Sequence, residues 1–395
     1  MTDNRALARH LFDAGVAAAD PFRAVARVLA DVQAPSLIIA VGKAATRMAQ
    51  AALAIFPVPC IIVTNCENAT HVAGAKVFAA GHPVPDMAGA KAAHAVISAL
   101  GQAKGSVLVL ISGGGSALLP APAGLLSLSD KSALNRVLLA SGLSIGKVNL
   151  IRQQVSDLKG GGMLCHCSYP VTALILSDVV GDDLSTIASG PTAPPLGTSA
   201  QAIAVLQGAG IWDAIPLAVQ THLETEIVPS ALPSARNVLV GSNSQSVAAM
   251  VAAQQGILQI PTPVEGDVSA AARLICDHAS PGITVWGGET TVQISGTGKG
   301  GRNQELALHI ACEARRRGWG DFTCLAGGTD GRDGPVDAAG GLVDSGTLGR
   351  ISAAGGDIYA LLANNDSYAA LGLAGDLLMT GATGTNVADL GVLIR

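Results

Sequence analysis

The hydrophobic positions of this 395-residue chain gather in short runs that are separated by longer segments of helical character. Within each run Val, Ile and Leu follow one another instead of alternating with polar residues. This pattern is typical of strands that are covered on both faces of a parallel sheet. We therefore expect strands at 36–42, 59–65, 106–114, 171–179, 237–243, 282–289 and 322–331.

The segments between these runs have helical periodicity. We expect helices at 43–56, 88–103, 129–141, 244–255, 268–278 and 303–317. Alternation of strands and helices indicates βαβ units and a doubly wound α/β sheet. The stretch Pro191–Pro233 opens with several Pro and Gly residues and is the candidate linker. We predict two α/β domains, a larger Rossmann-like domain at 1–232 and a smaller domain at 233–395.

Composition and charge narrow the class of protein. The net charge is −5 and the basic residues form no stripe beyond Arg315–Arg317, which argues against a nucleic-acid partner. No apolar run reaches the roughly 18 residues that a membrane span needs, and the N-terminus does not resemble a signal peptide. The seven Cys residues are irregularly spaced, and Cys165–Cys167 lacks a second ligand pair at zinc spacing. We expect a cytoplasmic protein with reduced thiols.

Polar and Gly-rich clusters follow the predicted strands, where ligands of parallel sheets bind. Lys43 lies in the first turn of a predicted helix, a position that disfavours a cation unless the cation serves a bound anion. A second cluster can form a backbone nest for phosphate oxygens, and it consists of Ser112, Gly113, Gly114, Gly115 and Ser116. This cluster is neither a Walker A loop nor a G-x-G-x-x-G fingerprint.

An acidic cluster follows the strand at 171–179. Asp178, Asp182 and Asp183 lie within six residues, a density of carboxylates that suits Mg²⁺. The alternative is that Asp178 is a turn residue and Asp183 a helix N-cap. The same segment contains Ser177 and Gly181 and leads to Ser189 and Gly190.

A Gly-rich stretch leads to Arg302, which begins another predicted helix. The guanidinium fork suits a carboxylate or phosphate ligand, and Glu289 and Asn303 lie in the same cluster. The alternative is a structural ion pair of Arg302 with Glu289 or Glu305.

The last strand is followed by Asp330, Asp333 and Asp337. Each of them could bind metal, take a proton or brace the loop. Phosphoryl transfer needs positioning groups, cations and Mg²⁺ but no covalent nucleophile, and the clusters supply these groups.

The clusters, in this order, resemble the class II glycerate kinase family, which is also called the MOFRL family and includes members labelled hydroxypyruvate reductase. The resemblance rests on VGKAA (41–45), GHPVPD (81–86), LISGGGSALLPAP (110–122), LSDVVGDDLSTIASGPT (176–192), GGETTV (287–292), GKGGRNQELAL (298–308), GGTDGRDG (327–334), DAAGGLVD (337–344) and TGATGTNVADL (380–390). The family usually has a basic residue and a His after Arg152, where this chain has Gln153 and Gln154.

The resemblance implies ATP-dependent phosphorylation of D-glycerate to 2-phosphoglycerate, with an active site between two α/β domains. It places the family's catalytic lysine and arginine on Lys43 and Arg302. We expect no membrane partner, and a monomer or a homodimer. We expect Asp182 to be a catalytic acid, and Asp178 and Asp182 to bind Mg²⁺. The residues expected around the ATP phosphates are Ser112–Ser116, Ser177, Gly181, Ser189 and Gly190. The residues expected to bind glycerate are Arg302, Asn303, Glu289 and Asp330.

Two other functions stay open at this point. An NAD(P)H-dependent hydroxypyruvate reductase would need a dinucleotide fingerprint, which Ser112–Ser116 does not provide. A non-catalytic metabolite-binding protein would not need Lys43, Arg302 and the acidic clusters together.

Overall fold

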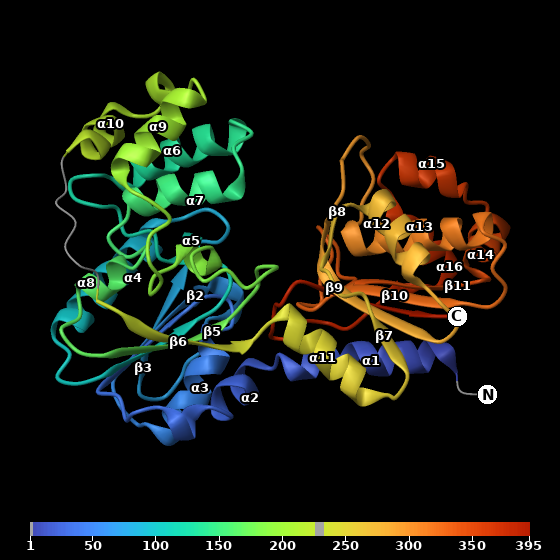
Figure 1. Cartoon of the computed structure of the whole chain (residues 1–395), viewed down its shortest axis with the longest axis horizontal. Helices are drawn as coiled ribbons and strands as arrows, with labels where there is room; N and C mark the ends of the chain where they lie inside the picture. Colours follow the sequence, from blue (N-terminus) through green and yellow to red (C-terminus); the bar gives the residue numbers. More distant parts are fainter. Residues whose placement is uncertain (1–2, 226–232) are drawn as a thin grey trace. The chain divides into compact units, whose positions relative to one another are not determined.

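The computed structural model describes residues 3–225 and 233–395, and its contacts divide the chain into two compact units (Figure 1). The parallel-sheet unit spans Pro21–Val240, and the mixed-sheet unit combines the residues up to Asp20 with Gly241–Arg395. The predicted domains, 1–232 and 233–395, differ in two respects. The first helix groups with the C-terminal residues, and the predicted boundary touches residues that lie outside the described part of the chain.

The parallel-sheet unit contains a six-stranded sheet in the order β3-β2-β1-β4-β5-β6, which is the Rossmann order. The pairings from β3 to β5 are parallel. The elements are α2 (Pro21–Ala26), β1 (Leu37–Val41), α3 (Ala45–Ile55), β2 (Cys60–Asn65), β3 (Ala75–Ala80), α4 (Met87–Gly101), β4 (Val107–Ile111), α5 (Gly115–Leu118), α6 (Leu128–Ala140), α7 (Ile145–Gln154), α8 (Gly162–Cys165), β5 (Val171–Leu176), α9 (Ser199–Gly208), α10 (Leu217–Glu224) and β6 (Ala235–Gly241). The predicted fold class is confirmed.

The central strands of this sheet are apolar because helices cover both of its faces. Ile39 of β1 and Val109 of β4 share a buried cluster with Val96 and Leu100 of α4. Helix α3 packs against β1, β2 and β4, and Figure 1 shows it on the other side of the sheet. Every residue of β1, β2 and β4 is buried, as the continuous apolar runs predict.

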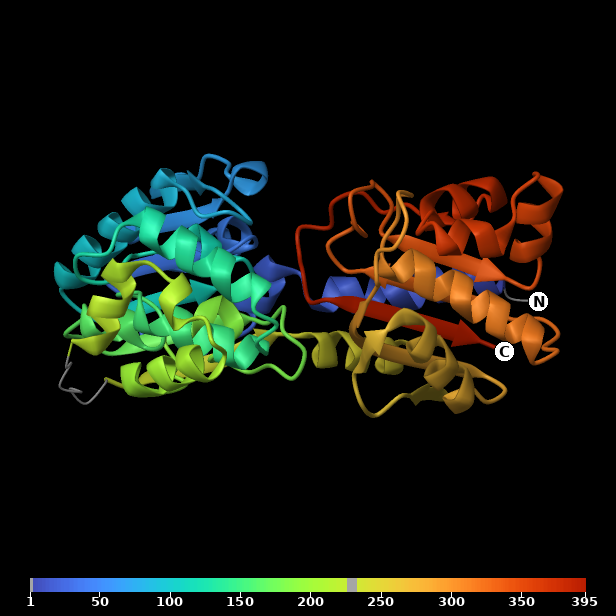
Figure 2. The same ribbon diagram turned by 90° about the horizontal axis from the view of Figure 1, so that it is seen from above.

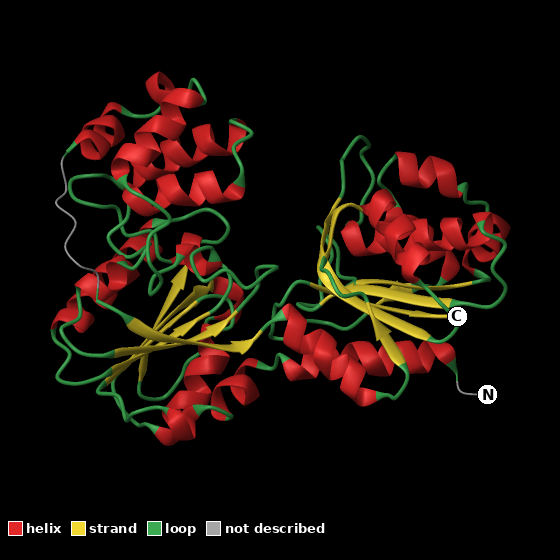
Figure 3. Ribbon diagram, viewed as in Figure 1, coloured by secondary structure: helices red, strands yellow, loops and turns green. Residues whose placement is uncertain are grey.

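Helices α6, α7, α9 and α10 form a helical cap on the parallel-sheet unit, where Figure 3 shows them clustered beyond the sheet. Leu134, Ile151, Leu206 and Val219 bury one side chain from each helix in a common core. The predicted linker Pro191–Pro233 is therefore wrong over most of its described length. Its apolar residues belong to α9 and α10, whose helical periodicity packs them into the cap.

The mixed-sheet unit contains a sheet in the order β12-β11-β10-β13-β9-β7, and β8 also pairs with β9. Its elements are α1 (Asn4–Ala18), α11 (Asn243–Ala253), β7 (Ile257–Gln259), β8 (Val264–Asp267), α12 (Val268–His278), β9 (Ile283–Thr291), α13 (Arg302–Arg316), β10 (Thr323–Gly328), β11 (Gly340–Asp344), α14 (Thr347–Ala353), α15 (Ile358–Ala363), α16 (Ser367–Ala374), β12 (Leu377–Leu378) and β13 (Asp389–Ile394).

The expectation of a purely parallel sheet is wrong for this unit. Strand β13 lies between β9 and β10 and is antiparallel to both. Leu325 of β10 packs with α1 and α11, whereas Cys324 and Ala326 pack with α13 on the other face. A strand that is buried on both faces has the same apolar pattern in either orientation, so the pattern alone could not reveal the direction of β13. Figure 2 shows α1, in blue, among the orange and red elements of this unit.

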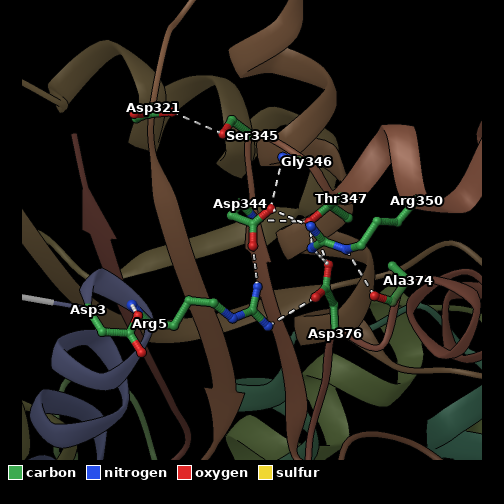
Figure 4. A network of polar contacts seen from close by, with 10 residues as sticks. All are labelled: Asp3, Arg5, Asp321, Asp344, Ser345, Gly346, Thr347, Arg350, Ala374 and Asp376. Carbon is green, nitrogen blue, oxygen red and sulfur yellow. Dashed lines mark hydrogen bonds and ion pairs between the residues drawn. The ribbon is translucent and has the colours of Figure 1, made fainter.

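A polar network fastens α1 to the mixed-sheet unit. Figure 4 shows the Arg5 guanidinium between the carboxylates of Asp344 and Asp376, which Arg350 also binds. The Asp376 side chain is only 2% exposed, so its two arginine partners compensate a buried charge. Burial would raise the pKa of Asp344, but hydrogen bonds from Arg350, the Gly346 amide and Arg5 lower it. Among the described residues, no helix is both long and apolar enough to cross a membrane.

Candidate active site

The centre of the parallel sheet is a switch point, because the chain continues from β1 to β2 on one side and from β4 to β5 on the other. Crevices beyond the carboxyl ends of strands at such points commonly hold ligands. The Lys43 amide donates a hydrogen bond to the Gly113 carbonyl (2.8 Å), and the Ala44 amide donates to Ser112 Oγ (3.0 Å). The two clusters predicted after β1 and β4 therefore meet.

Close packing explains the glycines of the Ser112–Ser116 loop. A Cβ atom on Gly113 would lie 1.9 Å from Asp178 Oδ2, so only glycine lets the loop pass this carboxylate. Gly114 adopts a left-handed φ of 84°, and a Cβ atom there would lie 3.2 Å from both Lys43 Cγ and the His82 ring. Lys43, His82 and Asp178 thus surround the loop.

The charges around this loop influence one another. Burial raises the pKa of Asp178, while a backbone hydrogen bond and the positive charge of Lys43 oppose the rise. Burial lowers the pKa of His82, and Lys43 lowers it further, whereas Glu67 acts in the opposite direction. Lys43 is therefore the cation of the switch point, and Asp178 is the acid beside it.

The segment after β5 supplies the other predicted phosphate-binding residues. Ser189 is buried, and its Oγ lies 2.7 Å from Ser116 Oγ, which joins this segment to the loop after β4. Gly190 is buried nearby and accepts a hydrogen bond from the Gly161 amide (2.8 Å). Ser177 is buried and donates to the Val179 carbonyl (3.1 Å), whereas Gly181 lies in an exposed turn.

The acids of this segment have different environments. Asp183 accepts hydrogen bonds from the hydroxyls of Ser185 (2.7 Å) and Thr186 (2.9 Å), so it braces a turn. The alternative interpretation of Asp183 as a helix N-cap is wrong, because the next short helix, Ile187–Ser189, has Thr186 at its N-cap. The Ser185 hydroxyl is the main cause of the lowered pKa of Asp183. Asp182 has a left-handed φ of 55° and is partly exposed, four residues beyond Asp178.

Asp178 and Asp182 are the carboxylates that could bind Mg²⁺ in this segment. Within residues 3–225 and 233–395, no group of three or more His, Cys, Asp or Glu side chains is arranged to hold a metal ion. Mg²⁺ in kinase-type sites usually takes one or two carboxylates and completes its shell with water and phosphate. Asp178, which lies against the triple-glycine loop, and Asp182 are compatible with that smaller donor set.

In the mixed-sheet unit, Arg302 is held by two acids. Its Nε and Nη2 atoms donate to the two carboxylate oxygens of Asp389 (2.6 and 3.0 Å), and its Nη1 atom lies 3.1 Å from Glu289 Oε1. Burial opposes the charge of Arg302, but Asp389 and Glu289 raise its pKa overall. The sequence anticipated a pair with Glu289, whereas the stronger partner, Asp389, was missed.

The three acids after β10 have separate roles in the structure. Asp333 is buried and accepts hydrogen bonds from the amides of Asn303 (3.1 Å) and Gln304 (2.8 Å) at the start of α13. Burial raises its pKa to about 6, although these hydrogen bonds oppose the rise. Asp330 accepts from the Arg332 amide (3.0 Å), and Asp337 accepts from the Tyr368 hydroxyl (2.8 Å). Of the roles left open, loop bracing is the one observed for Asp333.

The sequence analysis missed the acid Asp389 and a group of three basic residues. The first missed residue is Asp389, the first residue of β13. The signal that could have revealed it is its position as an acid directly before the apolar residues of the segment DLGVLI. The group of three consists of basic residues near α6 and α7, namely Lys131, Arg152 and Lys159. No strand end marks these three positions, because the helical cap brings them together through tertiary packing.

Known proteins are similar to this chain over nearly its whole length. Residues 7–224 match the Domain of unknown function (DUF4147), and residues 282–389 match the MOFRL family. A glycerate 2-kinase of Pyrococcus horikoshii is 36% identical over 99% of this chain and 97% of its own length. A protein of Agrobacterium vitis with a provisional hydroxypyruvate reductase name is 37% identical over 99% of this chain and 94% of its own.

A crystal structure of a glycerate kinase from Thermotoga maritima has a TM-score of 0.91 and 36% sequence identity, and the match covers 99% of both chains. With this identity and coverage, the likeness extends to both units and to the order of their elements. The chain therefore belongs to the glycerate kinase family, with a DUF4147 region followed by a MOFRL region.

Proposed function

We propose that this chain is an ATP-dependent glycerate 2-kinase that converts D-glycerate to 2-phosphoglycerate. Membership of the glycerate kinase family supports the reaction. The observation that carries the proposal is the meeting of Lys43 with the Ser112–Ser116 loop at the switch point of the parallel sheet. We further propose a cytoplasmic protein whose partners are its two small-molecule substrates.

The switch point would bind the ATP phosphates. The Ser112–Ser116 loop offers backbone amides, and Lys43 offers an ammonium group, so charge that develops on the transferring phosphoryl group is stabilised by preoriented donors. Asp178 and Asp182 would hold Mg²⁺, which supplies further neutralisation of phosphate charge when bound. The hydroxyl contact of Ser116 with Ser189 would keep the loop in its binding conformation.

Arg302 would bind the carboxylate of glycerate, assisted by Asn303 and Asp330. Asp389 grips two guanidinium nitrogens and its side chain is 7% exposed, so it fixes the orientation of the fork. Glu289 is 44% exposed and contacts only the third nitrogen, so it is the partner that a substrate carboxylate can displace. The binding group is thus positioned before the substrate arrives, which reduces the entropy lost on binding.

The transfer itself needs an acid beside the attacking hydroxyl. The glycerate 2-oxygen forms a bond to the γ-phosphorus, the bond from that phosphorus to the β,γ-bridging oxygen breaks, and the hydroxyl proton passes to a carboxylate. We assign this carboxylate to Asp182, with Asp330 as the alternative.

Phosphorus NMR of a mixture of the full chain, ATP, Mg²⁺ and racemic glycerate tests the proposal. The expected products are ADP and 2-phosphoglycerate, with no more than half of the racemate consumed. Inorganic phosphate as the sole new signal, or 3-phosphoglycerate as the product, would contradict it. The hydroxypyruvate reductase alternative, which the name of the Agrobacterium vitis relative favours, predicts instead that hydroxypyruvate consumes NADH or NADPH in an absorbance assay.

A further inference from the structure

A cavity of about 580 Å³ adjoins the triple-glycine loop within the parallel-sheet unit. Its walls come from the loop 82–85, from Gly114, Ser116 and Ala117 where the Ser112–Ser116 loop continues into α5, and from α6 and α7 of the helical cap. Four basic residues line it, namely Lys131, Arg136, Arg152 and Lys159, and the lining residues of the described chain include no Asp or Glu. The cavity therefore concentrates positive charge.

The three most enclosed cations have neutral partners. Lys159 Nζ donates to the Ser116 carbonyl (2.8 Å), Lys131 Nζ donates to the Pro120 carbonyl (2.5 Å), and Arg152 donates to Asn135 Oδ1. Among the ion pairs of the described residues, none involves Lys131, Arg152 or Lys159. Asp157 is the acid whose charge acts on Lys131, but it stays beyond ion-pair distance.

Enclosing these cations without acids is unfavourable for the fold. Burial lowers the pKa of Lys159 to about 7, and the neighbouring Arg152 contributes to the decrease. Burial also lowers the pKa of Lys131, as do Lys159 and Arg152. A ligand that brings several negative charges would remove this repulsion, and uncompensated cations in a cavity are more typical of binding sites than of structural cores.

The shape and lining of the cavity distinguish between the two substrates. Val84, Leu134, Leu139 and Val155 provide apolar walls beside the cations. Glycerate has three carbons, one carboxylate and no apolar face, so it would leave most of this volume unfilled. A nucleotide has a flat base for the apolar walls and a chain of phosphates for the cations, and a cavity of several hundred Å³ suits a ligand of that size.

We propose that this cavity holds the base, ribose and inner phosphates of the donor nucleotide, with Lys131, Arg152 and Lys159 on the α- and β-phosphates. The assignment rests on the proposed kinase function. Lys159 Nζ donates a hydrogen bond to the Ser116 carbonyl, so the cations of the cavity lie directly beside the Ser112–Ser116 loop. The terminal phosphate would therefore lie on that loop beside Lys43, where the transfer occurs.

Titration of the full-length protein with a fluorescent N-methylanthraniloyl derivative of ADP tests the assignment. Arg152→Met and Lys159→Met should each raise the Kd of this probe about ten- to a hundredfold, because each removes a charge-assisted contact to phosphate. Lys147→Met is the matched control, since Lys147 is an exposed residue of α7 outside the cavity lining. It should leave the Kd unchanged. Arg152→Lys, which retains the charge, should lose less affinity than Arg152→Met and serves if the latter fails to fold.

Thermal melting separates a binding role from a structural one. Lys131→Met removes a cation that has no acidic partner within ion-pair distance, so the melting temperature should not fall although the Kd of the ADP probe rises. A lower melting temperature with an unchanged Kd would assign Lys131 to the fold and overturn its binding role.

Steady-state kinetics distinguish failure of this inference from failure of the kinase proposal. Cavity variants that raise the KM for glycerate and leave the Kd of the ADP probe unchanged would overturn the inference but retain the kinase. A wild-type protein that binds the probe through these cations but does not phosphorylate glycerate would retain the cavity assignment and overturn the kinase. Wild-type affinity in Arg152→Met and Lys159→Met would overturn the assignment outright.

Discussion

The cations of the two units are compensated in opposite ways. In the parallel-sheet unit, Lys131, Arg152 and Lys159 have carbonyl or amide oxygens as partners. In the mixed-sheet unit, Arg302 has two acids as partners, and one of them, Asp389, is buried and makes a bidentate contact. The first arrangement leaves positive charge for a polyanion, whereas the second uses acids to fix the direction of one guanidinium group. Removing a cation should therefore have different consequences for stability in the two units.

The largest effect is expected for Arg302→Ala. It should reduce turnover at least about a hundredfold, because a donor to the substrate is lost. It should also lower the free energy of unfolding by about 3–5 kcal/mol, because Asp389 is left buried without its partner. Coupled ADP-release assays and urea unfolding measure the two effects.

The double variant Arg302→Ala/Asp389→Asn separates these two effects. Since it removes the orphaned carboxylate, it should regain part of the lost stability while turnover stays low. Recovery of turnover in the double variant would show that Arg302 acts through stability alone.

Lys43→Ala should affect activity without a comparable loss of stability. Lys43 is partly exposed and lies beside the Ser112–Ser116 loop. Its charge acts on Asp178, but among the described residues it makes no ion pair comparable to that of Arg302 with Asp389. We expect turnover to fall at least about a hundredfold, with a free energy of unfolding within about 1 kcal/mol of the wild type. Near-normal turnover in a coupled assay would contradict the assignment of Lys43 to phosphoryl transfer.

The sequence alone predicted most strands of the parallel sheet and, in the mixed sheet, the strands β9 and β10 that flank β13. All seven expected strands and all six expected helices are present, with their bounds shifted by a few residues. The continuous apolar runs sufficed for β1, β2, β4 and β10, because every residue of these strands is buried. By contrast the sequence analysis did not predict β13. Its place between β9 and β10 depends on pairing partners that lie more than 60 residues away in β10 and more than 100 residues away in β9. Local periodicity contains no information on such pairing.

The same distinction applies to the candidate site. Lys43 and the Ser112–Ser116 loop were predictable because each directly follows a strand, and adjacent parallel strands bring such ends together. Asp389 and Lys159 were not predictable in this way. Asp389 binds Arg302, which lies 87 residues away in the sequence. Lys159 donates to the Ser116 carbonyl, which lies 43 residues away in the sequence. Their roles follow from tertiary contacts that a motif does not encode.

The smallest predicted effect is a pH dependence of stability that arises from Lys159. Its folded-state pKa is about 7 against an ordinary value of 10.5, so the folded protein binds fewer protons than the unfolded chain between these limits. Stability should therefore rise with pH, by about 2 kcal/mol between pH 7 and pH 9. The other titratable groups that line the same cavity are Arg152 of α7, Lys131 and Arg136 of α6, and His82 of the loop 82–85. Lys131, Arg152 and His82 also have lowered pKa values, so each adds a rise of the same sign within its own pH range.

Urea unfolding across this pH range would measure the slope, and Lys159→Met should flatten it by removing the Lys159 contribution. Saturating ADP should flatten it as well, because bound phosphate favours the charged ammonium and restores proton binding in the folded state. A wild-type slope that Lys159→Met leaves unchanged would mean that Lys159 is not the group whose charge the fold opposes. In that case the contrast between cations without acidic partners and Arg302, which has two, would not hold for Lys159.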